Sequence, residues 1–260
     1  GKPTWFFDGP GRWQERNGVV TVDARGLTET TFADFAGHRG DREIRDHYGY
    51  NDGLGDNVVT DVRVRLNVEV RGTGELVLVL PEDGRETRCV LVAGGSGGAS
   101  RLMQDDRRLG ESDLKLTPGK EARVEFARVD YLVTVKVDGK DVFREDLWSE
   151  EVYRRLRDAG RQGRLGGHTE SGVRLGVRGL KATFTRVRID RDIYYTTQGR
   201  PHVFGPDTVR SGQYFGPIRL KDDQYLALGD NSPQSSDSRY WGCLLYTSDA
   251  ADELDGVDLG

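Results

Sequence analysis

One segment near the end of the chain, residues 229–242, gathers residue types that can support hydrolytic chemistry. It reads Gly-Asp-Asn-Ser-Pro-Gln-Ser-Ser-Asp-Ser-Arg-Tyr-Trp-Gly. Glycine lets a backbone approach a reacting group closely, and hydroxyls both donate and accept hydrogen bonds. An Asp-x-Arg pair such as Asp237 and Arg239 is, taken singly, usually a solvated ion pair. The whole set directly follows residues 224–228, which are predicted to form a strand, and this single register indicates a sequence motif instead of a surface turn.

This segment resembles the last sequence motif of the bacterial type I signal peptidases. The resemblance implies a membrane-anchored serine protease that removes signal peptides from exported preproteins with a Ser nucleophile and a Lys base. A lysine acts as a base near neutral pH only when burial and its neighbours lower its pKa from about 10.4. The motif positions imply that Ser235 hydrogen-bonds the lysine amine and that Gly229 lets the backbone approach the site.

The other motif positions are implied to support the active site. An ion pair would lie beneath the lysine, and turn residues would hold the loop. These positions are Asp230, Asn231, Asp237, Ser238 and Arg239, of which Asp237 and Arg239 form the pair. The chain departs from the familiar motif at Ser232-Pro233, where Arg and Asp are common, so the contacts of that Arg are not carried over.

The nucleophilic Ser and the base Lys of the family lie near its N-terminal membrane anchor, and neither motif is found here. We therefore expect a fragment that is inactive alone, with both residues and the anchor upstream. Two other motifs mimic the missing parts. Residues 94–98 (Gly-Gly-Ser-Gly-Gly) fit a nucleophile elbow without its helix, and residues 112–115 (Ser-Asp-Leu-Lys) fit Ser-x-x-Lys at a strand edge. We expect both to be structural.

The last residues, 243–260, differ in composition from the rest of the chain. They contain five acidic residues and no Lys or Arg. Their sequence resembles a translated sequencing adapter, the alternative being a disordered acidic tail, and we leave them out of the fold prediction. These five acidic residues account for the formal net charge of −5, so the rest of the chain is formally neutral. It has no basic patch that would indicate a nucleic-acid partner.

Residues 56–195 alternate apolar and polar residues in short runs separated by Gly and Asp turns, as in 62–70. This period of two is typical of half-buried strands, and Asp83-Gly84 and Asp138-Gly139 are hairpin turns. The pattern predicts a mainly β protein, an antiparallel sandwich of jelly-roll type. One helix is expected, with Ser149 as its N-cap and an end at Gly160.

The flanks lack the periodic length of an independent domain. We therefore expect residues 1–40 and 196–242 to be two parts of an incomplete all-β signal-peptidase catalytic fold, with the sandwich inserted as residues 41–195. The arrangement resembles planctomycete-like signal peptidases with a concanavalin-like or laminin-G-like insert. The points of resemblance are residues 47–51, 124–130, 137–139 and 191–196.

The resemblance also implies partners and location. Preprotein signal peptides would be the substrates, and the catalytic and inserted domains would lie on the extracytoplasmic side of the inner membrane. No apolar stretch approaches the roughly 20 residues that cross a bilayer, so the anchor is expected upstream. The alternative function is a lectin-like module that binds a glycan or protein without catalysis, and a third is a ligand-free structural insert.

No cofactor or metal is expected. The four histidines lack metal-ligand spacing. Asp52, Asp56 and Asp61 carry oxygens suited to calcium, but a solvated turn is the favoured interpretation. Outside the tail, Cys89 is the single cysteine, and its apolar surroundings predict a buried thiol.

Overall fold

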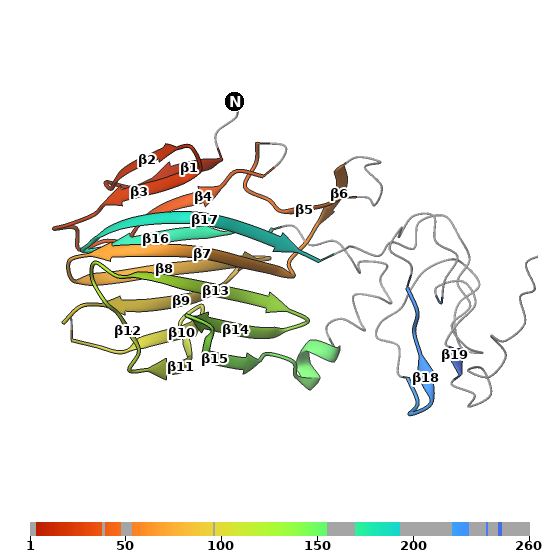
Figure 1. Ribbon diagram of the computed structural model, residues 1–260. Helices are drawn as coiled ribbons and strands as arrows, with labels where there is room; N and C mark the ends of the chain where they lie inside the picture. The colour runs from red at the N-terminus through yellow and green to blue at the C-terminus, as the bar shows by residue number, and fades with distance from the viewer. Residues whose placement is uncertain are drawn as a thin grey trace, which may run out of the picture. The chain divides into compact units, whose positions relative to one another are not determined.

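The computed structural model describes residues 4–37, 40–47, 54–95, 97–154, 170–192, 220–228, 238 and 244–245. The chain divides into two compact units. The first comprises Gly1–Asp46, Leu54–Trp148 and Gly166–Asp192, and the second comprises His47–Gly53, Ser149–Leu165 and Ile193–Gly260. Almost every described element is a strand, which confirms the mainly β prediction (Figure 1).

The first large sheet of the first unit has the order β1-β4-β16-β8-β9-β10-β11, and β12 adds to β9. The neighbours along this path are antiparallel, whereas β12 is parallel to β9. The strands are β1 Trp5–Asp8, β4 Thr31–Phe35, β16 Arg174–Arg178, β8 Gly74–Glu82, β9 Arg85–Ala93, β10 Ser100–Gln104, β11 Arg107–Ser112 and β12 Lys115–Leu116.

The second large sheet is antiparallel throughout and has the order β15-β14-β13-β7-β17-β3-β2. Its strands are β15 Lys140–Asp146, β14 Leu132–Val137, β13 Glu121–Val129, β7 Val62–Arg71, β17 Lys181–Arg191, β3 Val19–Asp23 and β2 Arg12–Arg16. Two small sheets pair β5 (Arg45–His47) with β6 (Leu54–Val58) and β18 (Gln224–Tyr225) with β19 (Leu244–Leu245).

The core lies between the two large sheets, as the alternating pattern predicts. Every second residue of β7 is buried, beginning with Val62. Leucines of β8 approach from the opposite sheet, and Phe126 and Phe184 are among the largest fully buried side chains. The predicted turns are confirmed, because Asp83 and Asp138, each followed by glycine, have positive φ angles of 47° and 51°. Consecutive positive φ angles are what a two-residue hairpin turn requires.

The N-terminal segment differs from the prediction. Strands β1 to β4 lie inside the sandwich, because β4 pairs with β16 and β3 pairs with β17. Trp5, Val20 and Val22 join the same core. Residues 5–35 therefore complete the two sheets and do not form part of a separate peptidase domain. The first unit ends at Asp192, close to the predicted boundary at residue 195.

The predicted helix begins where its cap residue places it. Residues 150–154 are helical, and the N–H of Val152 donates to Oγ of Ser149 over 3.2 Å. This bond satisfies one of the free N–H groups of the first turn, so the predicted N-cap is confirmed. The predicted end of the helix at Gly160 lies outside the described residues.

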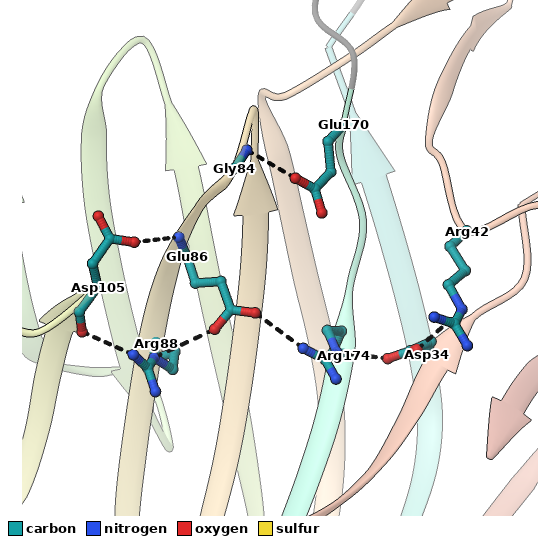
Figure 2. Close-up of polar contacts among 8 residues, drawn as sticks. All are labelled: Asp34, Arg42, Gly84, Glu86, Arg88, Asp105, Glu170 and Arg174. Carbon is teal, nitrogen blue, oxygen red and sulfur yellow. Dashed lines mark hydrogen bonds and ion pairs between the residues drawn. The ribbon is translucent and has the colours of Figure 1, made fainter. Parts of the chain in front are cut away.

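The outer face of the first sheet is covered by a row of paired charges (Figure 2). Arg174 contacts Asp34 at 2.7 Å and Glu86 at 3.0 Å. Its guanidinium carbon also lies 4.3 Å from the centre of the Phe32 ring. Beneath this layer, three valines and Phe32 form a small apolar cluster: Val77, Val79 and Val90 pack with Phe32. The charges therefore screen the apolar outer face of this sheet from solvent.

Candidate functional site

Ser238 is the member of the predicted site that the structure describes. Its side chain is buried, its N–H donates to the carbonyl oxygen of Ala227 over 3.0 Å, and the N–H of Ala227 donates to its Oγ over 3.0 Å. The other predicted site residues lie outside the described residues: Gly229, Asp230, Asn231, Ser235, Asp237 and Arg239. Ser238 therefore ties the motif to the end of the apolar run that precedes it.

These two bonds define what Ser238 can do chemically. The hydroxyl oxygen already accepts a backbone hydrogen bond, so its direction is fixed by the chain that precedes the motif. Ser238 is consequently suited to holding a loop in place and poorly suited to moving toward a substrate. Its contribution to catalysis stays a prediction, as do the roles of the residues around it.

The strand before the motif is shorter than predicted. Pairing covers Gln224 and Tyr225, where the sequence predicts a strand over residues 224–228. Its partner, β19, lies in the segment interpreted as translated adapter. Backbone groups form such pairs whatever the side chains are. The pairing therefore does not test the adapter interpretation, which stays a prediction.

The two motifs that mimic catalytic residues lie where the sequence predicts them. Residues 94–98 connect β9 to β10, so a strand follows where a nucleophile elbow needs a helix, and Ser96 lies outside the described residues. Ser112 ends β11, and its Oγ accepts a bond from the N–H of Leu114 over 3.2 Å. Lys115 belongs to β12, which pairs with β9. The predicted positions, a loop between two strands and a strand edge, are confirmed, and the absence of a catalytic role stays a prediction.

A buried charge that the sequence analysis missed joins the two sheets at one end of the sandwich. Arg128 points into the core from β13, and its side chain is 3% exposed. It contacts Glu82 of the first sheet at 3.2 Å and donates to the carbonyl oxygen of Thr60 over 2.9 Å. Burial lowers the pKa of Arg128, and Glu82 opposes this change. The sequence does contain a signal for Arg128. It is a charged residue at a position of β13 where the alternating pattern expects a buried apolar side chain.

Asp61 lies beside this charge. Its Oδ1 accepts a bond from the N–H of Asp130 over 3.2 Å. Burial, the largest cause, raises the pKa of Asp61, and the negative charges of Asp130 and Asp192 add to the increase. The structure therefore holds a carboxyl group that ionises less readily than an ordinary aspartate.

Asp61→Asn should stabilise the protein at pH 7 and have little effect near pH 3.5. The pKa of Asp61 is higher in the folded protein than in the unfolded chain, where it is about 3.9. The stability of the protein therefore falls as the pH rises from about 3.9 through the raised pKa of the folded state. Asparagine keeps an oxygen for the N–H of Asp130 and carries no charge. Urea unfolding of both proteins between pH 3.5 and 8 measures the difference.

Asp138→Asn is the matched control for this prediction. Asp138 also accepts a backbone bond, from the N–H of Arg123 over 2.8 Å, but its turn is exposed. Because this side chain is exposed, its substitution should change the stability at pH 7 by less than Asp61→Asn does. A difference for Asp61→Asn that is constant with pH, or that reverses its sign, would contradict the expected burial effect.

The described residues provide neither a metal cluster nor a membrane span. They contain no group of three or more His, Cys, Asp or Glu side chains placed to hold a metal. Likewise, no helix in the described part of the chain has the length and apolar character to cross a bilayer. The side chains of Asp52 and Asp56 lie outside the described residues. Cys89 is buried, as predicted, and burial raises the pKa of its thiol.

Comparison with known sequences supports the signal peptidase family for the C-terminal part of the chain. Residues 171–251 match the family model described as signal peptidase, peptidase S26, and this range contains the whole motif 229–242. A stretch of 28 residues is 61% identical to the protein named "Probable signal peptidase I-2" of Synechocystis sp.. That stretch covers 11% of this chain and 13% of the relative.

Comparison with solved structures finds other β proteins. A carbohydrate binding module from Bacillus subtilis has a TM-score of 0.46 and 10% identity, covering 72% of this chain and 95% of the module. The exoplasmic/lumenal domain of VIP36 also has a TM-score of 0.46 and 10% identity, covering 76% of this chain and 87% of that domain. These likenesses concern the arrangement of strands and assign no ligand.

Proposed function

We propose that this chain is the C-terminal portion of a signal peptidase I, a Ser/Lys-dyad endopeptidase that removes N-terminal signal peptides from exported preproteins. The match of residues 171–251 to the peptidase S26 family carries the proposal. The 28-residue stretch that is 61% identical in the Synechocystis protein supports the same family. Because this stretch spans 13% of that relative, the activity, substrates and location of the whole protein belong to the proposal.

In the proposed mechanism, the serine hydroxyl attacks the carbonyl carbon of the bond to be cut, while the lysine amine accepts the hydroxyl proton. The lysine then returns a proton to the leaving amine, and water releases the acyl group from the serine. Both catalytic residues would belong to sequence upstream of this chain. A base that is not aimed at the nucleophile loses much of its effect, so its orientation is part of the catalysis.

The motif would supply that orientation. Ser235 would hydrogen-bond the lysine amine, and an ion pair of Asp237 with Arg239 would support the loop from below. Asp230 and Asn231 would shape the turn of this loop. The bonds between Ser238 and Ala227 would anchor this loop to the preceding segment, and they are the contacts in the structure that support the scheme.

The sandwich would be a module placed within a membrane-bound peptidase, with residues 196–242 returning to the catalytic domain. The family implies that the sandwich and the catalytic domain lie on the extracytoplasmic side of the inner membrane. In this scheme the anchor precedes the chain described here, together with the nucleophile and the base.

The gene on either side of this chain tests the proposal. We expect the upstream sequence to encode an apolar anchor of about 20 residues, then a motif with the nucleophilic Ser and a later motif with the Lys. The natural downstream sequence should diverge from residues 243–260. An upstream sequence without the Ser and Lys motifs would contradict the assignment.

A further inference from the structure

A small pocket with a volume of about 170 Å³ lies where β12, the start of β13 and the turn between β14 and β15 meet. It lies beside the end of β7 at Arg71, because Glu121, which lines it, stands opposite Glu69. The chain leaves the sandwich beyond Arg191, which stands opposite Val62 at the other end of β7 (Figure 1). The ten residues of β7 span about 30 Å at about 3.3 Å per residue. The pocket is therefore remote from the end where the chain leaves the first unit.

The floor of this pocket is apolar. Leu116, Ala122 and Val137 line it and belong to the core between the sheets, with exposed fractions of 4%, 8% and 5%. Leu114 adds a partly buried side chain that packs against the same core. A volume of 170 Å³ equals that of about six molecules of liquid water, since each occupies about 30 Å³. The pocket therefore has room for a small apolar group, such as a short branched hydrocarbon chain.

The rim of the pocket is cationic. Lys115, Lys120 and Lys140 line it, and all three are exposed residues. Lys140 stands opposite Val137 in the hairpin, and cross-strand partners share a face of the sheet, so its stem leaves the sheet on the side of the floor. Among the residues that the structure describes, the side chains of Lys120 and Lys140 have no ion-pair or hydrogen-bond partner.

The two acidic groups of the lining have partners of their own. Oε1 of Glu121 accepts a bond from the side-chain amide of Asn67 over 3.0 Å. Oδ1 of Asp138 accepts a bond from the N–H of Arg123 over 2.8 Å and so holds its turn in place. Three lysines beside two carboxylates give the lining an excess of one positive charge. The ammonium groups of the two unpaired lysines are therefore the groups available to a ligand.

The open space above the floor distinguishes this pocket from an ordinary lysine-covered surface. Lysine stems often cover apolar surface while their ammonium groups remain in water. Here the stems on the rim leave a volume of about 170 Å³ unfilled over buried core residues. An apolar floor with cations at its edge is complementary to an anion that carries a small apolar group.

We propose that this pocket binds a small apolar carboxylic acid, either as a free acid or as the C-terminal residue of a peptide. The apolar group lies on Leu116, Ala122 and Val137, and the carboxylate reaches Lys120 and Lys140. Burial of the apolar group and charge-assisted hydrogen bonds to the ammonium groups both favour this ligand. A neutral apolar molecule lacks the second contribution and a simple anion lacks the first. This inference concerns the sandwich and does not depend on the proposed peptidase activity.

Titration of the 260-residue chain, followed by the ¹H–¹⁵N chemical shifts of its amides, tests the proposal. We expect 4-methylpentanoate to shift the amides that line the pocket, with a Kd on the order of 1 mM. The neutral 4-methylpentanamide and acetate should each bind about fivefold more weakly or less. Tighter binding of N-acetylleucine than of 4-methylpentanoate identifies a peptide terminus as the source, and the reverse order identifies a free acid.

Substitutions at the rim and at the floor separate the two parts of the site. The double variant Lys120→Gln/Lys140→Gln should weaken the binding of 4-methylpentanoate about tenfold, because it removes both ammonium groups. Ala122→Leu should abolish this binding by filling the pocket. Lys136→Gln is the matched control, because Lys136 belongs to the same hairpin but pairs with Asp141 at 3.6 Å and does not line the pocket. Its Kd should stay within about twofold of that of the parent.

Three results would each overturn the proposal. The first is that 4-methylpentanoate shifts none of the amides that line the pocket. The second is that it binds no more tightly than its neutral amide. The third is that the double lysine variant, folded as judged by its melting temperature, binds 4-methylpentanoate as the parent does.

Discussion

Ser235→Ala in the complete enzyme should lower preprotein turnover by about 100-fold. General-base catalysis contributes about 10²–10⁴ to rate, and in the proposed mechanism Ser235 directs the lysine that acts as the base. Without this hydroxyl, the lysine amine keeps its basicity but is less often oriented toward the nucleophilic serine. The loss should appear in kcat, with KM little changed, because Ser235 is proposed to contact the lysine and not the signal peptide.

Two further variants separate this role from a structural one. Ser235→Thr keeps the hydroxyl and should recover most of the turnover, whereas Ser236→Ala removes the neighbouring hydroxyl and should have little effect. Cleavage of a purified preprotein, followed at saturating substrate, measures all three. Equal turnover of Ser235→Ala and the parent enzyme would remove Ser235 from the site.

Arg128→Ala should destabilise the sandwich by about 3–5 kcal/mol. Removing one partner of a buried ion pair leaves the other charge without compensation, and this desolvation cost exceeds what an exposed pair contributes. Glu82, whose side chain is 14% exposed, would remain facing the core without Arg128. The carbonyl oxygen of Thr60 would also lose the bond from the guanidinium. Urea unfolding at pH 7 gives the difference.

The same strand supplies the control for this experiment. Arg123 is exposed on β13. Arg123→Ala should change stability by less than about 0.5 kcal/mol, as expected for a surface site. The double variant Arg128→Met/Glu82→Gln should be more stable than Arg128→Ala, because it buries no unpaired charge. A cost for Arg128→Ala no larger than that for Arg123→Ala would show that the pair contributes nothing.

Most of the sandwich could be predicted because its signals are local. Alternation over Val62–Arg71 gives a strand with one buried face, and the Asp-Gly turns set the hairpins. Strands β1, β2 and β4 could not be recognised as part of it. They are short, lie at or near sheet edges and are stabilised by pairing with strands distant in sequence, so the segment before residue 40 shows little periodicity of its own.

The candidate site was predicted from residue types, and its contacts depend on three-dimensional pairing. The motif itself suggests that Ser238 holds a loop, but its partner, Ala227, becomes apparent only when the two segments lie side by side. Arg128 breaks the apolar pattern of β13, and its partner lies on the other sheet.

Cleavage of a preprotein by the complete protein tests the central claim most directly. The purified full-length enzyme, in detergent, should cut a preprotein at the end of its signal peptide, and the product's new N-terminus identifies the bond. The 260-residue chain alone should leave the same preprotein intact, because the nucleophile and the base are proposed to lie upstream. A full-length protein that leaves the preprotein uncut would contradict the assignment, as would cleavage by the 260-residue chain alone.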